Sequence, residues 1–116
     1  GTSTGVLRAA DKLGYQVDLV AVNHWDKAIA THMANHPGCR TLCAKIENVD
    51  PREAVPSGKL DLLCASPECI WHSRARGGRP INDQRRSSAW RVLEWLERLD
   101  VKNVLIENVK EFADWG

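Results

Sequence analysis

Apolar positions along the chain alternate between a helical period and continuous, strand-like runs. Helical spacing begins with residues 1–14, where Gly14 acts as a stop signal. It returns in residues 25–38, which end at Pro37-Gly38, and in residues 83–100, where Ala89, Val92, Leu93, Leu96 and Leu99 share one face. Strand-like runs cover residues 15–23, 41–46, 59–66 and 102–109. This order predicts an α/β fold with a largely parallel sheet.

The runs 59–66 and 102–109 are apolar at most positions, which is typical of strands buried on both faces. A proline-containing linker, residues 47–58, precedes the first of them. Carboxyl ends of parallel strands meet at one edge of a sheet, where ligands bind. Three loops rich in polar and reactive residues, 22–26, 65–73 and 107–112, should therefore converge on one site.

Composition narrows the function classes only slightly. The chain has 116 residues, enough for one compact domain, and its net charge of +1 carries no global signature of nucleic-acid binding. No apolar run has the length of a membrane span, and no secretory signal pattern is present. The four cysteines lack the paired spacing of a disulfide scaffold, so we expect reduced thiols and a cytoplasmic location.

Specific motifs carry a resemblance to a known family. The run LDLLCASPECIWHS, the basic loop behind it, DQRRSSAW and the strand end IENVKEF resemble the central motifs of DNA (cytosine-5)-methyltransferases. VNHWDKAIATHMANHP is similar to that family's second cofactor motif, and GTSTGVLRAADKLGY to the helix behind its glycine-rich loop. The Ser-Pro-Glu-Cys version of the loop is closest to phage and prophage members.

The resemblance implies catalytic roles for Cys69 and Glu107. Cys69 would be the thiolate that adds to cytosine C6, and Glu107 would hold the N3 edge of the base. The cytosine must be flipped out of the duplex to reach them. Glu68 directly before the thiol, where the family has proline, would raise the thiol pKa, and Ile70 replaces the usual glutamine.

The resemblance also implies S-adenosylmethionine as cofactor and DNA as partner. The cofactor-binding residues would be Gly1, Asn23, His24 and Trp25, with the Trp25 ring against the adenine. His24 stands where the family commonly has an acid for the ribose, and Lys45 aligns with an aspartate that accepts from the adenine amino group. Glu47 or Asp50 could substitute for that aspartate. DNA contacts are expected from Ser73, Arg74, Arg76, Arg79, Arg85 and Asn108, and Asn108 would also brace its turn.

The implied fold class is a Rossmann-like, S-adenosylmethionine-dependent methyltransferase core with a mostly parallel sheet. Compared with the family, the core is incomplete: the first strand and the C-terminal part, including the target recognition domain, are missing. Residues 1–116 would form a partial catalytic domain. Without its central strand the sheet would have a gap between the strands at 16–23 and 60–65, which makes a homo-oligomer possible.

Two other functions remain open. A degenerate fragment could keep the fold without catalysis and act as an oligomerising or nucleic-acid-binding module. A small zinc-binding domain is the other, because His32, His36, Cys39 and Cys43 are close in sequence. No Cys-x-x-Cys pair is present and Cys43 reads as an inward strand residue, so no metal site is expected. Each motif also has a plain structural interpretation: a buried thiol, a polar turn, a core tryptophan, a solvated basic loop.

Overall fold

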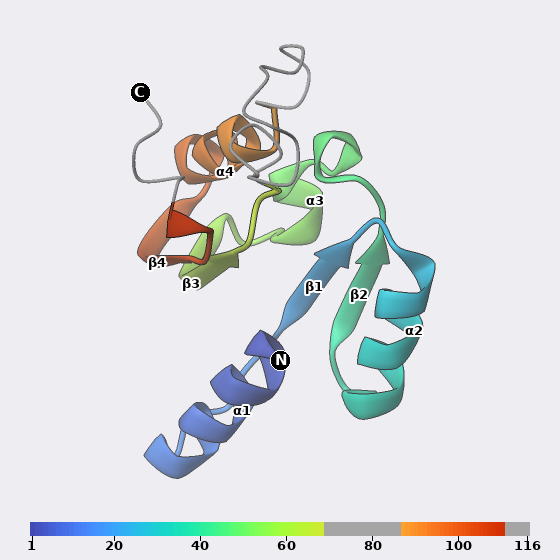
Figure 1. Ribbon diagram of the computed structural model, residues 1–116. Helices are drawn as coiled ribbons and strands as arrows, with labels where there is room; N and C mark the ends of the chain where they lie inside the picture. Colours follow the sequence, from blue (N-terminus) through green and yellow to red (C-terminus); the bar gives the residue numbers. More distant parts are fainter. Residues whose placement is uncertain (69–86, 111–116) are drawn as a thin grey trace. The chain divides into compact units, whose positions relative to one another are not determined.

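The computed structural model describes residues 1–68 and 87–110 of the chain (Figure 1). It divides into two compact units, Gly1–Val49 and Asp50–Gly116. Each unit contains one pair of parallel strands. The sequence-based prediction of a mixed helix-and-strand fold with parallel pairing is confirmed at this level.

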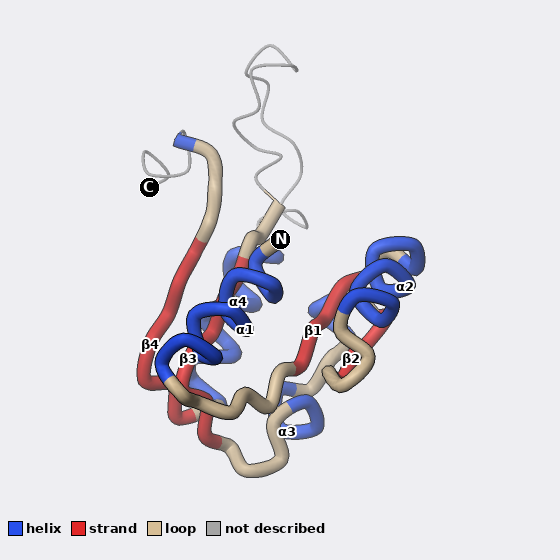
Figure 2. Tube along the Cα trace, turned by 90° about the horizontal axis from the view of Figure 1, so that it is seen from below, coloured by secondary structure: helices blue, strands red, loops and turns tan. Residues whose placement is uncertain are grey.

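The first unit alternates helices and short strands. In order these are α1 (Thr2–Leu13), β1 (Val20–Asn23), α2 (Asp26–Asn35), β2 (Arg40–Cys43) and the 3₁₀ turn η1 (Ile46–Asn48). Strands β1 and β2 pair in parallel, and α2 packs alongside both of them (Figure 2). The predicted strand at 15–23 is shortened to its last four residues, because β2 offers only four residues to pair with it.

The end of α1 follows the predicted stop signal. Gly14 adopts a left-handed conformation with φ of 76°, and its N–H donates to the Asp11 carbonyl. The next N–H, from Tyr15, donates to the Ala10 carbonyl at 2.9 Å. Glycine is favoured here because it adopts positive φ without a steric penalty.

The second unit places a helix against the other strand pair. Its elements are α3 (Pro51–Ala54), β3 (Lys59–Ala65), α4 (Ser87–Arg98) and β4 (Asp100–Ile106). Strands β3 and β4 pair in parallel, and α4 packs against β4 (Figure 1). Short helical turns at η1 and α3 replace the irregular linker expected at 47–58. Asp50 and Pro51 explain α3, because an aspartate N-cap followed by proline at the first helical position is a strong start signal.

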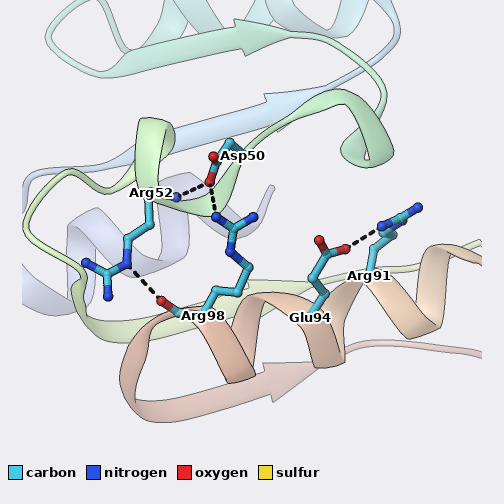
Figure 3. A network of polar contacts seen from close by, with 5 residues as sticks. All are labelled: Asp50, Arg52, Arg91, Glu94 and Arg98. Atoms are coloured by element: carbon cyan, nitrogen blue, oxygen red, sulfur yellow. Dashed lines mark hydrogen bonds and ion pairs between the residues drawn. The ribbon is translucent and has the colours of Figure 1, made fainter.

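A small polar network joins α3 to the end of α4 (Figure 3). The Asp50 carboxylate accepts from the Arg52 N–H at 2.9 Å and pairs with the Arg98 guanidinium at 3.1 Å. The Nε of Arg52 donates to the Arg98 carbonyl at 3.0 Å, which satisfies a free carbonyl at the end of α4. Arg91 and Glu94 pair one turn apart along the same helix.

The buried side chains of the second unit are few and centre on α4. Trp95 and Leu99 of α4 are 6% and 5% exposed, and Ala54 and Val55 are also buried. The predicted apolar face included Leu93 and omitted Trp95, whereas Leu93 is exposed. The buried face of α4 is therefore the one that contains Trp95 and Leu99, which lie one turn apart, and not the predicted face that contained Leu93.

Strand β4 is not buried on both faces, contrary to the sequence-based expectation. Val104, Leu105 and Ile106 are 43%, 55% and 45% exposed, and Leu62 of β3 is exposed as well. Successive strand residues point to opposite faces, so both faces carry exposed apolar side chains. The physical reason is that a two-stranded pair with one helix packed against it cannot cover both of its faces.

Candidate functional site

The carboxyl ends of β3 and β4 lie side by side and bring two of the sequence motifs together. Ala65 is paired with Ile106 in the parallel register, and the Glu107 N–H donates to the Ala65 carbonyl at 2.9 Å. Glu107 is therefore the first residue after β4, and its side chain is exposed. This places the Glu-Asn-Val turn, residues 107–109, beside the Ser-Pro-Glu segment that follows β3.

Asn108 fastens these two segments to one another. Its Nδ2 donates to the Pro67 carbonyl at 3.0 Å, and its Oδ1 accepts from the Val109 N–H at 2.8 Å. Both ends of the amide are thus used within the protein, and the Asn108–Pro67 bond is partly buried. The expected brace of the turn is present in the structure, whereas the expected DNA contact of Asn108 stays a prediction.

A second side chain holds the same segment from α4. The Ser88 hydroxyl, in the first turn of that helix, donates to the Glu68 carbonyl at 3.4 Å. Ser88 was not identified as a site residue from the sequence. Its hydroxyl was the available signal, because serine at a helix start commonly bonds to nearby backbone, but its partner is twenty positions away.

The other predicted residues of this region lie outside the part of the chain that the structure describes. Their roles as nucleophile or DNA contacts stay predictions. They are Cys69, Ser73, Arg74, Arg76, Arg79 and Arg85.

The predicted cofactor residues of the first unit gather where β1 ends. The Asn23 side-chain oxygen accepts from the Trp25 N–H at 2.8 Å, which turns the chain sharply into α2. Trp25 is the residue before the first turn of α2, and its side chain is 58% exposed. The indole is therefore not a core aromatic, and one flat apolar ring stands at the start of a helix.

The end of β2 lies beside this turn. Asn23 is paired with Cys43, the Ala44 N–H donates to the Asn23 carbonyl at 3.0 Å, and the Cys43 thiol lies 4.0 Å from the His24 carbonyl. Cys43 is exposed, so its interpretation as an inward strand residue was wrong. Lys45 follows, also exposed.

The surroundings of two further predicted cofactor residues, Gly1 and Asp50, show whether each is available to a ligand. Gly1 precedes α1, and a side chain added there would meet no other atom within 4 Å. Asp50, one of two candidates to replace the missing aspartate, is already engaged by Arg52 and Arg98. Glu47 is exposed and is the better candidate of the two.

The histidines and cysteines of the first unit do not assemble into a metal centre in the described residues, where no group of three potential ligands occurs. His32 and His36 instead approach hydroxyl groups of α1. Across the described part of the chain, no helix has both the length and the apolar character needed to cross a membrane.

Comparison with known proteins gives a consistent result. The profile of one protein family, C-5 cytosine-specific DNA methylase, matches residues 2–115. Type II methyltransferase M.AgeI of Thalassovita gelatinovora is 32% identical over 96 aligned residues, covering 78% of this chain and 22% of the relative. The chain thus spans about a fifth of the length of the curated relative it matches. No solved structure shows significant similarity.

Proposed function

The chain belongs to the C-5 cytosine-specific DNA methylase family, and from this premise we propose that it forms the catalytic core of a DNA cytosine-5 methyltransferase. One observation carries the proposal: Asn108 holds the turn that contains Glu107 against the segment leading into Cys69. A nucleophile and a base-binding carboxylate must act on the same cytosine ring, so the segments bearing them must be neighbours. A Rossmann-like arrangement of the complete sheet is part of this proposal.

The proposed chemistry assigns one task to each residue. The Cys69 thiolate attacks C6 of a flipped cytosine and forms an Sγ–C6 bond, while Glu107 binds the N3 edge and stabilises the developing enamine. Once C5 has accepted a methyl group, loss of the C5 proton and cleavage of the Sγ–C6 bond restore the aromatic ring and the free thiol. Asn108 and Ser88 act as positioning residues: they bond to the Pro67 and Glu68 carbonyls, directly before Cys69 in the chain.

The end of β1 suits the adenosyl part of S-adenosylmethionine. The exposed Trp25 ring offers a stacking surface for the adenine, and Gly1 leaves open space at the start of α1. The Asn23 side-chain oxygen fixes the backbone at Trp25 by accepting from its main-chain N–H, and His24 is the side chain proposed for the ribose. S-adenosylmethionine supplies the methyl group that C5 accepts.

Trapping the covalent adduct tests the proposal most directly. Duplex DNA with 5-fluorocytosine keeps the adduct intact, because fluorine at C5 cannot leave as a proton does. With S-adenosylmethionine present, we expect a protein–DNA band that resists denaturation, and none from Cys69→Ser. Cys43→Ser is the matched control, since Cys43 is also exposed and should leave the adduct unchanged. An adduct in both variants would overturn the role of Cys69.

The exposed apolar side chains of β3 and β4 favour one alternative, a catalytically inactive fragment that acts as an oligomerising or nucleic-acid-binding module. Calorimetry with S-adenosylmethionine separates the two. The catalytic proposal expects saturable binding that Trp25→Ala weakens by at least about tenfold, as the loss of one stacked ring implies. No binding at millimolar cofactor, together with DNA binding or self-association, would favour the alternative.

A further inference from the structure

Two histidines of α2 join that helix to the first turn of α1. The Nε2 of His32 lies 2.9 Å from the Ser3 hydroxyl, and the Nε2 of His36 lies 3.1 Å from the Thr4 hydroxyl. Both contacts are partly buried and connect residues about thirty positions apart. Adjacent hydroxyls on one helix are thus matched by imidazoles one turn apart on the other.

The surroundings favour neutral imidazoles. The two rings are 5.0 Å apart between centroids, so two imidazolium charges would repel each other. The Nδ1 of His32 is buried and has no hydrogen-bond partner among residues 1–68 and 87–110, so a proton added there would meet no acceptor in that part of the chain. The first turn of α1 contains no acidic residue, and its helix dipole presents positive charge to the rings.

Catalytic and metal-binding interpretations of this cluster fail on the same geometry. A serine activated by a histidine needs a third group that orients the ring, and His32 Nδ1 has none. A metal site needs more ligands than two imidazoles, and no group of three exists in the described residues.

We propose that Ser3, Thr4, His32 and His36 form an acid-sensitive clasp that holds α1 on α2 at neutral pH and releases it when His32 is protonated. The clasp is independent of methyl transfer, since it uses none of the residues assigned to that reaction. Gly1, the residue before α1, is however a proposed cofactor residue, so release of α1 would loosen that end of the cofactor site.

The direction of the pH effect follows from His32. Burial, and then the charge of His36, lower the pKa of His32 below its ordinary value of 6.5. The folded pKa therefore lies below the unfolded one, and unfolding or release takes up a proton. Stabilisation by the clasp is complete above about pH 6.5 and is lost as the pH falls through the folded pKa.

Other charged groups near these helices do not cause the lowered pKa of His32. The candidates are Arg40 of β2 and its partner Asp18, which lies 3.5 Å away. The lowered pKa of His32 is accounted for by burial and by His36, without a contribution from these groups. The neighbouring imidazole is thus the charge that matters for release.

Hydrogen exchange of the backbone amides tests the clasp in the full chain. Exchange is followed at about pH 7.5 and about pH 5.5, on either side of the ordinary histidine pKa, and corrected for intrinsic rates. We expect protection of α1 to fall by up to about tenfold at pH 5.5, which is the limit for one proton taken up one pH unit below the ordinary histidine pKa, while β1 and β2 keep theirs. His32→Gln with His36→Gln should remove the pH dependence, and His24→Gln, which alters an exposed ring outside the clasp, should retain it.

Three results would overturn the proposal. The first is equal protection of α1 at both pH values in the unaltered protein. The second is a parallel loss over α1, β1 and β2, which would indicate acid unfolding of the whole unit. The third needs no variant: NMR titration in which His32 titrates no lower than the exposed His24 would remove the physical basis of the clasp.

Discussion

At the scale of single residues, Asn108 shows how a side chain can support a proposed site by fixing the backbone around it. Its amide donates to Pro67 and accepts from Val109, so it fixes the backbone on either side of the proposed base-binding carboxylate. A motif resemblance can mark such a residue as part of a site. It cannot distinguish positioning from ligand contact, because the donor–acceptor pairing depends on a loop forty-one positions away.

Replacing Asn108 with alanine should therefore lower stability slightly and adduct formation strongly. Loss of one partly buried hydrogen bond costs about 1 kcal/mol, measured by urea unfolding. Asn103→Ala is the matched control, because its Nδ2 also donates to a backbone carbonyl, that of Asp61 in β3, at 3.0 Å. It should lose similar stability and retain the 5-fluorocytosine adduct. Equal adduct formation by both variants would contradict the positioning role of Asn108.

Two glycines differ in what surrounds their positive φ. Gly58 has φ of 71°, and a Cβ there would lie 2.7 Å from the Arg52 guanidinium, whereas Gly14, at 76°, has open space. We expect Gly14→Ala to cost about 1–2 kcal/mol from backbone strain alone. Gly58→Ala should cost more, because Arg52 must also move away from the Arg98 carbonyl. Comparing Gly58→Ala in the Arg52→Ala background, by urea unfolding, isolates that second contribution; an unchanged difference would refute it.

At the scale of elements, periodicity predicted the helices and strands where the pattern was long. Helices α1 and α2 and strand β3 lie within the predicted ranges, whereas β4, Asp100–Ile106, begins and ends earlier than the strand predicted at 102–109. Short elements were missed for different reasons: α3 is only four residues long and depends on its cap. The buried face of α4 was predicted incorrectly: Trp95 was placed outside the apolar face but is buried, and Leu93 was placed on it but is exposed.

Asp50 has two separable roles in the joint between α3 and α4. Asp50→Ala removes both the N-cap and the ion pair with Arg98, and should cost about 1–2 kcal/mol. Asp50→Asn keeps a capping oxygen and loses only the ion pair, which is about 40% exposed on each side and so contributes well under 1 kcal/mol. Thermal unfolding of both variants would measure the difference, and equal losses would show that the cap contributes nothing.

At the scale of the whole molecule, the strand pairs explain both the success and the limit of prediction from sequence. Parallel pairing and the joining of the loops at 65–68 and 107–109 followed from strand order. The burial of these strands could not be predicted in the same way. The apolar runs of β3 and β4 are typical of a larger sheet, whereas the described residues form two-stranded pairs. The resemblance predicted both cofactor and catalytic segments, yet the pairing partners of Ser3, Thr4 and Ser88 required coordinates.

This exposed apolar surface makes a prediction about solution behaviour. Leu105→Lys, at a 55% exposed position, should change stability by no more than about 0.5–1 kcal/mol and reduce binding of an apolar fluorescent dye. Leu99→Ala, at a position 5% exposed, should cost about 2–5 kcal/mol. If Leu105→Lys leaves dye binding unchanged, the dye does not bind at the exposed apolar side chains of β3 and β4.

The side-chain amide of Asn108 also makes the proposed site sensitive to slow chemical damage during storage. Deamidation slowly converts an asparagine side chain into a carboxylate: its nitrogen leaves as ammonia, and water supplies the new oxygen. The product would present an oxygen, not a donor, to the Pro67 carbonyl, so an attraction becomes a repulsion. Stored protein should therefore lose its proposed catalytic geometry by chemical damage at one residue while its strands and helices remain folded.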